Sequence, residues 1–296
     1  MMTGTPAARK RTSRRLANGD RAVKSRRTTS VSQNGRVRYR VVDVFTDRPL
    51  AGNALCVVLD PCPEERMQAI AREMNLSETT FVTERGEGTY SMRIFTPGVE
   101  LPFAGHPTLG TAWVMGPGRW TQGTAGGRIP VTAGEHGAEM TQPDPAFSEA
   151  ADAGMREAVG VDRVLGVWRA EAAGNAHLVA AVDEPIDALR PHPDMVRELL
   201  DTQATITLAV VLRLDARTLH VRVFFRSVGI AEDPGTGSAA GPVGVLARRL
   251  WDLGPDLLIR QGDEIGRPCR IRVHAEPGDL RVAGGVVLAA EGRFVL

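Results

Sequence analysis

Two glycine-rich turns, 130 residues apart, carry residue types that could bind an anion and move a proton. The first turn runs Gly105-His106-Pro107-Thr108 and the second Gly235-Thr236-Gly237-Ser238, and a small-residue apolar segment follows each. Such a segment predicts a helix, and the N–H groups at a helix start can hold a carboxylate. We expect the acidic residues Glu78 and Asp233 beside these turns. The pattern therefore indicates proton transfer on a carboxylate-bearing molecule.

Each candidate residue has a chemical role that follows from its type. A glutamate enclosed in an apolar cleft has a raised pKa, so Glu78 could both take and return a proton near neutral pH. His106 could donate a hydrogen bond to a developing anion or orient the substrate. Asp233 could hold an amino group or polarise His106. The expected substrate-binding residues are Ser238, Gly105, Gly235, Thr236, Gly237 and Asn53.

The same residues also have structural interpretations. Taken alone, Glu78 fits a solvated carboxylate at a strand end, and Asp233 fits an Asp-Pro turn. His106 and Ser238 fit helix caps, and Asn53 fits a turn. The motifs around them favour function for Glu78, His106 and Asp233, and leave Ser238 and Asn53 open.

The elements that position these residues repeat. An arginine-bearing strand pattern, a loop and a glycine turn occur at 92–108 and again at 221–238, which indicates two halves with one internal plan. Alternation and apolar runs predict strands, and i, i+3, i+4, i+7 spacing predicts helices. Pro242 falls past the first turn of its helix and should cost a hydrogen bond and bend it. The predicted strands are 38–45, 54–59, 78–82, 90–95, 129–131, 136–140, 164–168, 177–182, 206–212, 219–225, 257–260, 270–274 and 280–288, and the helices are 64–74, 109–115, 155–159, 195–200 and 239–250.

Charge is unevenly distributed along the 296 residues. Residues 1–36 carry ten basic residues and one acid, whereas the remaining 26 basic and 34 acidic residues give a net charge of −8. The mildly acidic body argues against nucleic acid as its substrate. The arm has almost no apolar periodicity, which is typical of disorder. An unstructured extension is favoured over a tail that binds nucleic acid or a membrane.

Composition excludes several other classes. No apolar stretch follows the arginines as a signal peptide requires, and no run of about 18 apolar residues could span a membrane. Three scattered cysteines do not suit a disulfide framework or a zinc site, and the histidines have no metal-ligand spacing. We therefore expect a cytoplasmic protein with no metal and no cofactor. Cys56, inside an apolar run, is expected to be a buried small hydrophobe.

Five ordered motifs carry a resemblance to a known family. They are Val42-Asp43-Val44-Phe45-Thr46 with Gly52-Asn53, Asn75-Leu76-Ser77-Glu78-Thr79-Thr80-Phe81, Phe95-Thr96-Pro97 with Glu100 to Thr108, Glu232-Asp233-Pro234-Gly235-Thr236-Gly237-Ser238, and Gln261-Gly262 with Gly266-Arg267-Pro268. In this order, over residues 37–296, they resemble the phenazine-biosynthesis PhzF-like family. The match is specific for the family and much less so for a substrate.

The resemblance implies an α/β (α+β) fold of the diaminopimelate epimerase-like type. Two pseudo-symmetric lobes each wrap a curved mixed sheet around a central helix, and the active site lies between them. We expect a disordered arm at 1–36, an N-terminal lobe at 37–148 plus 280–296, and a C-terminal lobe at 149–279. A homodimer is expected from the resemblance alone.

The resemblance also assigns roles to residues. It makes Glu78 the acid/base group of a cofactor-independent isomerase and adds His106 and Asp233 to the catalytic set. The implied substrate is a small, unsaturated, carboxylate-bearing molecule such as dihydro-hydroxyanthranilate, or a proline-like antibiotic intermediate. Related racemases place a cysteine before each pair of glycines, where this chain has Ala104 and Pro234. Two-thiol racemisation is therefore not expected.

Three alternatives remain open at this stage. The chain could be a non-catalytic protein that binds a small acid, although binding alone does not require an acid/base group. It could be an epimerase or racemase of a related amino acid. In the third alternative the basic arm is the functional part, with nucleic acid as its partner. Deleting the arm separates the last alternative, because an isomerase should be unaffected.

Overall fold

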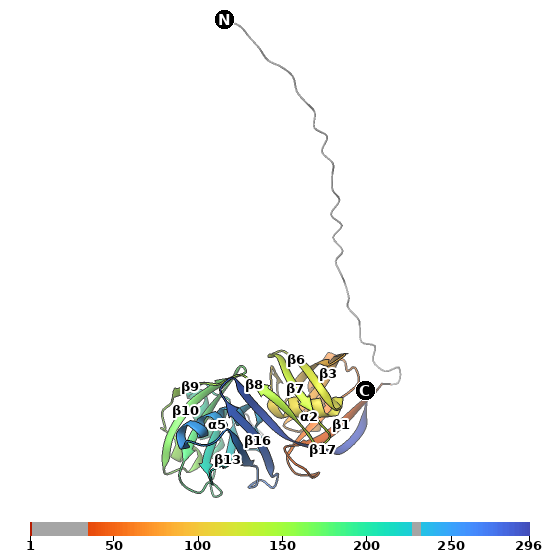
Figure 1. Ribbon diagram of the computed structural model, residues 1–296. Coiled ribbons are helices and arrows are strands. Elements are labelled where there is room, and N and C mark those ends of the chain that lie inside the picture. Colours follow the sequence, from red (N-terminus) through yellow and green to blue (C-terminus); the bar gives the residue numbers. More distant parts are fainter. Residues whose placement is uncertain (2–34, 227–231) are drawn as a thin grey trace.

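The computed structural model describes residues 1, 35–226 and 232–296. Of the expected basic arm at 1–36, only residues 1, 35 and 36 are described. Arg36 already pairs with Val295 in the first strand, and the Val37 side chain is fully buried. The folded part therefore begins slightly earlier than expected. Figure 1 shows two lobes side by side, with the C-terminal strand β17 beside β1.

The two lobes share most of their elements, and the second lobe has the additional short helix α3 (Met155–Val159). The first comprises β1 (Arg36–Val44), β2 (Asn53–Val58), α1 (Glu64–Met74), β3 (Glu78–Gly86), β4 (Thr89–Phe95), β5 (Glu100–Leu101), α2 (Gly105–Met115), β6 (Gly118–Thr124), β7 (Gly127–Ala133) and β8 (Gly137–Gln142). The second comprises β9 (Ala146–Glu149), α3 (Met155–Val159), β10 (Val164–Ala172), β11 (Asn175–Val182), α4 (Pro193–Thr202), β12 (Thr207–Arg213), β13 (Thr218–Phe225), β14 (Glu232–Asp233), α5 (Gly237–Trp251), β15 (Asp256–Gln261) and β16 (Cys269–Glu276). The final strand is β17 (Asp279–Val295).

Strand pairing confirms that the two halves share one plan. In the first lobe β2 and β3 pair in parallel, β4 is antiparallel to β3, and β6 is parallel to β4. The second lobe repeats this arrangement. Strands β11 and β12 pair in parallel, β13 is antiparallel to β12, and β15 is parallel to β13. A short hairpin strand, β5 or β14, precedes the long helix in each lobe. The repeat seen in the sequence is therefore a repeat of structure.

The last strand joins the lobes. Residues 279–283 of β17 pair with β16, and residues 280–285 pair with β8. Beyond this point β17 runs antiparallel to β1, from Val286 to Val295. At the other junction β9 pairs with β10, so residues 146–149 lie in the second sheet. The boundary expected after residue 148 thus falls inside a strand.

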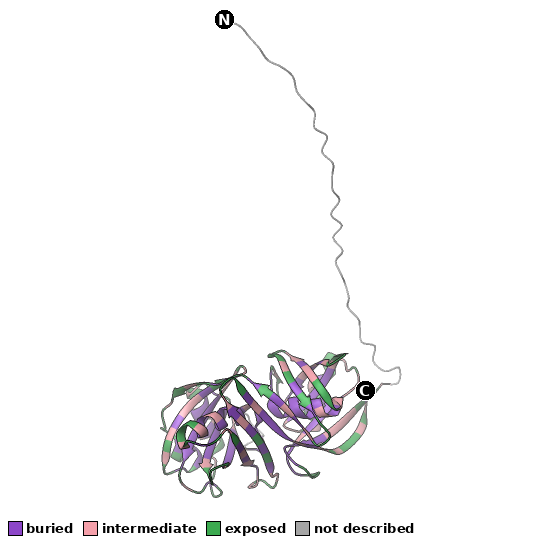
Figure 2. Ribbon diagram, in the orientation of Figure 1, coloured by how far each residue is buried: buried purple, intermediate pink, exposed green. Residues whose placement is uncertain are grey.

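Each lobe encloses one long helix. Nine of the residues of α2 are buried, from Gly105 to Val114, and nine of α5, from Gly237 to Ala247. Helices that are small and apolar on all sides are typical of such surroundings. Figure 2 shows α2 almost entirely in the buried colour, covered by strands. The predicted curved sheet around a central helix is confirmed. Helix α5 continues through Pro242 to Trp251.

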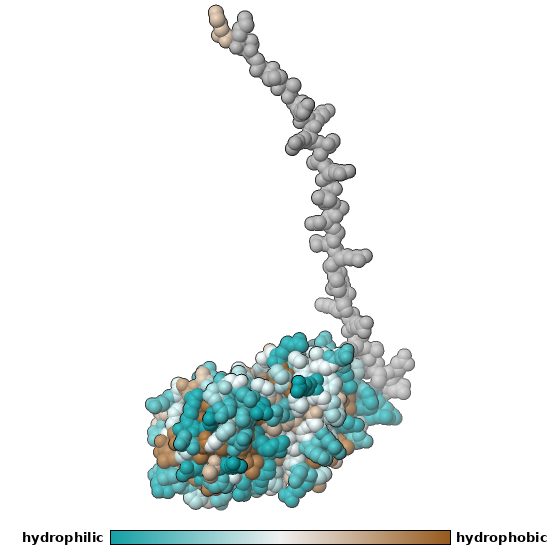
Figure 3. Space-filling view, viewed as in Figure 1, coloured by the Kyte–Doolittle hydropathy of each residue, from teal (hydrophilic) through white to brown (hydrophobic). Residues whose placement is uncertain are grey.

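Shorter helices cover the outside of the sheets. The amphipathic helix α1 buries Met67 and Ile70 against Phe81, and α3 and α4 pack together on the second sheet. Cys56 is fully buried, as expected. In the described residues no helix is long and apolar enough to span a membrane. The face in Figure 3 is mostly hydrophilic, with small scattered hydrophobic areas.

The register of the repeat differs from the one inferred from sequence. Ile94 pairs with Leu101, and Val223 pairs with Asp233, so Leu101 and Asp233 are equivalent. Each helix starts four residues later, which makes Gly105 equivalent to Gly237 rather than to Gly235. The alignment of the two turns was therefore two residues out. The reason is the longer connection from β13 to β14.

Candidate active site

The two long helices begin against each other, from opposite lobes. A side-chain carbon added to Gly105 would lie 2.5 Å from backbone atoms of both Gly237 and Ser238. Only glycine permits this approach. The pairing brings the N-terminal N–H groups of α2 and α5 to one place. The three expected catalytic side chains surround this meeting point.

Glu78 is the first residue of β3 and is enclosed by the protein. Its residue surface is 7% exposed, and Oε2 has no hydrogen-bond partner among the described residues. Oε2 lies 3.4 Å from Nε2 of His106. Burial raises the pKa of Glu78 well above its usual value, and the charge of Asp233 raises it further. The solvated strand-end carboxylate considered for this residue is therefore wrong.

His106 is the second residue of α2 and is equally enclosed. Burial lowers its pKa to about 3, although a backbone hydrogen bond with Ala54 acts in the opposite direction. The imidazole is therefore neutral at pH 7. Its Nδ1 lies 3.3 Å from the side-chain nitrogen of Asn53, and its Nε2 has no hydrogen-bond partner among the described residues. A neutral ring can donate or accept one hydrogen bond at that nitrogen.

Asp233, in β14, comes from the other lobe and is 3% exposed. Its carboxylate accepts hydrogen bonds from Asn53 (3.0 Å) and from the Thr236 hydroxyl (2.5 Å). Burial raises its pKa to about 6, the two hydrogen bonds lower it, and the charge of Glu232 raises it. No hydrogen bond joins the Asp233 and His106 side chains within the described part of the chain. Asn53 stands between them, so direct polarisation of His106 is not supported.

Asn53 bridges the two lobes. Its side-chain nitrogen donates to Asp233 and, at 3.0 Å, to the carbonyl oxygen of Gly235. The side chain is 1% exposed, and its Oδ1 has no partner among the described residues. We expected Asn53 to bind substrate, but the protein itself occupies the nitrogen. Only the oxygen remains for a bound molecule.

The second glycine turn is held from within the C-terminal lobe. Gln261 donates to the backbone oxygen of Asp233 (2.8 Å) and to the Thr236 hydroxyl (3.1 Å), and it accepts from the Thr236 N–H (3.2 Å). The N–H of Thr236 is thus engaged and does not face an anion. Gly235 and Gly237 are buried, and Ser238 is partly exposed. Thr236, not Ser238, precedes the helix as its N-cap residue.

Sequence reasoning did not find the contacts that fix this geometry. Gln261 was noted in a motif without a role. Arg267, in another motif, binds Asp43 across the lobes (2.6 Å) and donates to the carbonyl oxygen of Gly52 (2.9 Å). The Gly52 N–H in turn donates to Pro268. These bonds hold the turn that carries Asn53 against the C-terminal lobe.

The one group of possible metal ligands among the described residues lies elsewhere. Asp187, His220 and Glu264 have ligand atoms within 4.8 Å of one another. Nδ1 of His220 faces Asp187 at 3.6 Å, and Nε2 faces Glu264 at 2.7 Å. Each ring nitrogen therefore faces a different carboxylate, so the two acids do not share one nitrogen. A metal would need both acids beside one nitrogen.

The two lobes and the buried acid/base cluster between them define the class of protein. A Bacillus anthracis phenazine biosynthesis protein of the PhzF family has the same fold, with a TM-score of 0.78, 24% identity, and coverage of 88% of this chain and 99% of that chain. A probable proline racemase from Agrobacterium radiobacter K84 gives a TM-score of 0.60 at 12% identity, with coverage of 88% and 93%. The expected diaminopimelate epimerase-like fold is confirmed.

Sequence similarity gives the family. Residues 42–292 match the model of the family described as phenazine biosynthesis-like protein. The trans-2,3-dihydro-3-hydroxyanthranilate isomerase of Pseudomonas aeruginosa is 38% identical over 283 residues, which cover 88% of this chain and 99% of that protein. The chain belongs to the phenazine biosynthesis-like, or PhzF-like, family. It is an isomerase of that family.

Proposed function

We propose that this chain isomerises a small, unsaturated, carboxylate-bearing metabolite, with Glu78 as the group that transfers the proton. The observation that carries the proposal is the enclosed Glu78 carboxyl. It has a raised pKa and an oxygen without a hydrogen-bond partner among the described residues, 3.4 Å from His106. A neutral carboxyl can give a proton to one ring carbon, and the resulting carboxylate can take a proton from another. The double bond moves, and the number of protons is unchanged.

The other residues take supporting roles in this proposal. Neutral His106 orients the substrate or donates a hydrogen bond to developing negative charge. Asp233, fixed by Asn53 and Thr236, holds a substrate amino group. The N–H groups where α2 and α5 begin, with Ser238, hold the carboxylate. The similarity to the Pseudomonas aeruginosa enzyme favours a cyclic amino acid of the dihydro-hydroxyanthranilate type. No cofactor is needed for such a proton shift.

The test uses trans-2,3-dihydro-3-hydroxyanthranilate in deuterium oxide with wild type and Glu78→Gln. A neutral Glu78 exchanges with solvent before substrate binds, so wild type should place deuterium on the newly protonated carbon. Glu78→Gln keeps the size of the side chain and should place none. Undiminished incorporation in the variant would remove Glu78 from the mechanism. No turnover by wild type would favour another substrate, such as a proline-like acid, or a binding protein.

An epimerase remains the second candidate because Asp233 supplies another buried carboxyl with a pKa of about 6. The position of the label separates the two reactions. An epimerase returns deuterium to the carbon that lost its proton, whereas an isomerase labels a different carbon. A racemic product with one labelled carbon would replace the isomerase proposal.

The compartment and the oligomeric state of the protein are also part of the proposal. We propose a cytoplasmic homodimer with a small-molecule partner and no nucleic-acid partner. Sedimentation tests the dimer. Deleting residues 1–34, and not 1–36, tests the basic arm, because Arg36 already pairs with Val295 and the backbone of Gly35 accepts a hydrogen bond from Leu296. Activity should be unchanged in this deletion. A loss of activity would assign the arm a part in function.

A further inference from the structure

A cavity of about 480 Å³ lies at the junction of the lobes, apart from the acid/base cluster. Its walls come from the turn after β1 (Phe45 to Arg48), from His136 between β7 and β8, and from Arg270 and Arg272 on β16. The volume falls in the range of small-molecule sites. Residues from both lobes therefore form the cavity.

The cavity walls carry an excess of positive charge. Arg48, Arg270 and Arg272 line them, against the single carboxylate of Asp47. Among the described residues, the Arg48 and Arg272 side chains form no ion pair or hydrogen bond. Arg270 contacts Asp263 at 3.2 Å, but Arg260 shares that carboxylate at 3.2 Å. Arginines that line one cavity and are only partly balanced by acidic groups attract anionic oxygens.

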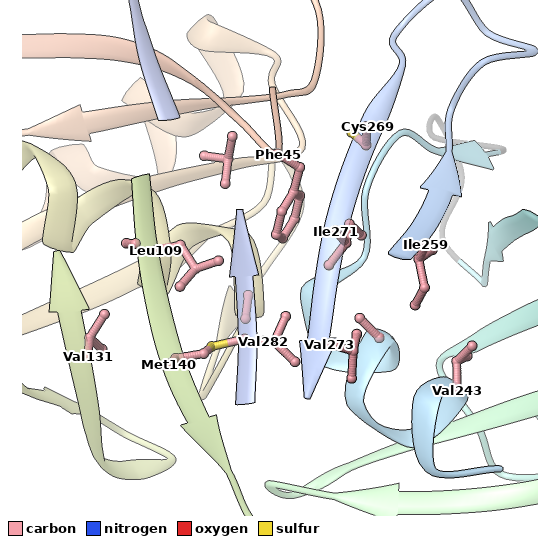
Figure 4. Packing of buried hydrophobic residues seen from close by; sticks show 14 of the residues in the cluster. Phe45, Leu109, Val131, Met140, Val243, Ile259, Cys269, Ile271, Val273 and Val282 are labelled. Carbon is pink, nitrogen blue, oxygen red and sulfur yellow. The ribbon is translucent and has the colours of Figure 1, made fainter. Parts of the chain in front are cut away.

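Phe45 separates this cavity from the active site. Side-chain carbons added to Gly235 and Gly237 would lie 2.9 Å and 3.1 Å from its ring. The ring thus packs directly on the turn that follows Asp233. Figure 4 shows Phe45 between the lobes, with Leu109 to one side and Ile271 to the other. Its φ of 67° is unusual for a bulky residue, and such strain concentrates at functional sites.

We propose that the cavity is a second binding site, for a small polyanion that carries phosphate or carboxylate groups. Three arginines that line one cavity suit a compact ligand with several anionic oxygens. A ligand there touches both lobes. The inner wall of the cavity is Phe45, which packs on the turn that follows Asp233. Binding therefore stabilises the arrangement in which the lobes enclose Glu78. The site is independent of the reaction proposed above.

The test is calorimetric titration of the full chain at constant ionic strength, with inorganic pyrophosphate, citrate and sodium chloride as separate probes. We expect saturable binding of pyrophosphate or citrate, and none of chloride. The stronger of the two identifies the phosphate or the carboxylate class. Arg272→Gln and Arg48→Gln should each weaken binding by about tenfold, the effect of losing one charge-assisted hydrogen bond. Both side chains are exposed, so folding is retained.

Arg119→Gln is the matched control. Arg119 is an exposed arginine of β6 outside the cavity, and its loss should leave the affinity unchanged. Two results would overturn the proposal. Without saturable binding, the arginines are an ordinary solvated surface. If the affinity is equal in wild type and Arg272→Gln, the anion binds elsewhere, including at the helix starts beside Glu78.

Discussion

The two lobes have one fold but different chemistry at equivalent positions. Glu78 pairs with Leu55 at the start of β3, and Thr207 pairs with His177 at the start of β12, so Thr207 is the counterpart of Glu78. The Thr207 hydroxyl is 2.7 Å from Nδ1 of His177, and both residues are fully buried. At the position where one lobe has a carboxyl, the other has a hydroxyl that is paired with Nδ1 of His177, although Nε2 of His177 has no hydrogen-bond partner among the described residues.

The difference continues at the helix starts. His106 in the first lobe corresponds to Ser238 in the second, and Leu101 corresponds to Asp233. The first lobe thus supplies the proton-transfer group and the imidazole, and the second supplies a fixed carboxylate and a hydroxyl. The pseudo-symmetric backbone brings two helix starts together. Because the residues at equivalent positions differ, the proton-transfer group lies in one lobe only, and the site is one-sided. A one-sided site suits a proton shift better than an inversion.

We expect the largest change in activity at Glu78 and almost none at its counterpart Thr207. Glu78→Gln should lower kcat/KM by about a thousandfold, because general acid–base groups contribute roughly a hundredfold to ten-thousandfold. Thr207→Val, at the equivalent position, should change the rate by less than about threefold but destabilise the fold by about 1–3 kcal/mol, since it leaves His177 without its partner. Steady-state kinetics and denaturant unfolding measure the two effects. Similar rate losses in both variants would contradict a one-sided site.

The two hairpins that precede the helices give the next comparison. Arg93 binds Glu100 through two bonds of 2.7 and 2.8 Å, and Arg222 binds Glu232 through two of 2.8 and 2.6 Å. Each guanidinium also lies 5.2 Å from the ring of a phenylalanine on its strand. The surroundings differ, because the side chains are 31% and 37% exposed in the first pair and 5% and 6% in the second.

We expect Arg222→Met to lower the free energy of unfolding by about 3–5 kcal/mol, since it leaves Glu232 charged and buried. It also removes hydrogen bonds to the carbonyl oxygens of Ile186 and Leu189. Arg93→Met should cost about 0–1 kcal/mol, as exposed pairs do. Chemical denaturation checks both values. Adding Glu232→Leu to Arg222→Met should recover part of the loss, and no recovery would mean that packing, not charge, sets the cost.

The fold was largely predictable because local patterns and the repeat agreed. The spacing of Met67, Ile70 and Met74 predicted α1 to the residue. Strand β6 was missed because its sequence, with two glycines and little alternation, has no strand pattern. The local pattern predicted β17 only to residue 288, and its continuation to residue 296 was expected from the family resemblance alone, because that part pairs with β1, some 250 residues earlier in the chain.

The residues of the candidate site could be named from the sequence, but the contacts between them could not. Motifs identified Glu78, His106 and Asp233, and the structure places them together. Asn53 donates a hydrogen bond to Asp233, 180 residues away, and Arg267 binds Asp43, 224 residues away. Both contacts depend on how the lobes dock. No local pattern records such contacts. The shift of two residues in the repeat has another origin, because the connection from β13 to β14 is longer than that from β4 to β5 and composition does not show how the extra residues are placed.

A third prediction uses pH. The raised pKa of Glu78 means that the folded state holds its proton more tightly than the unfolded chain. Stability from this group is present below the unfolded pKa of 4.5 and is lost as pH rises through the folded pKa. Glu78→Gln removes the titration. Its stability relative to wild type should therefore grow above pH 4.5, at up to about 1.4 kcal/mol per pH unit.

Thermal or urea unfolding of both proteins at several pH values measures that difference. Asp233, whose pKa is raised to about 6, and His106, whose pKa is lowered to about 3, titrate in both proteins, so their contributions largely cancel. A difference that stays constant from pH 4 to 8 would mean that Glu78 ionises normally. The proposed acid/base role would then lose its physical basis.

The smallest effect concerns Ser238, the counterpart of His106. No hydrogen bond of its side chain appears among the described residues, and Thr236 already precedes the helix. If Ser238 acts only as a helix cap, its removal should change the kinetics and the stability little. If Ser238 contacts the substrate, its removal should change KM alone. Ser238→Ala should raise KM by about tenfold, the effect of one lost hydrogen bond to a carboxylate, with kcat and the unfolding midpoint nearly unchanged. A lower midpoint with unchanged KM would instead make Ser238 part of the scaffold.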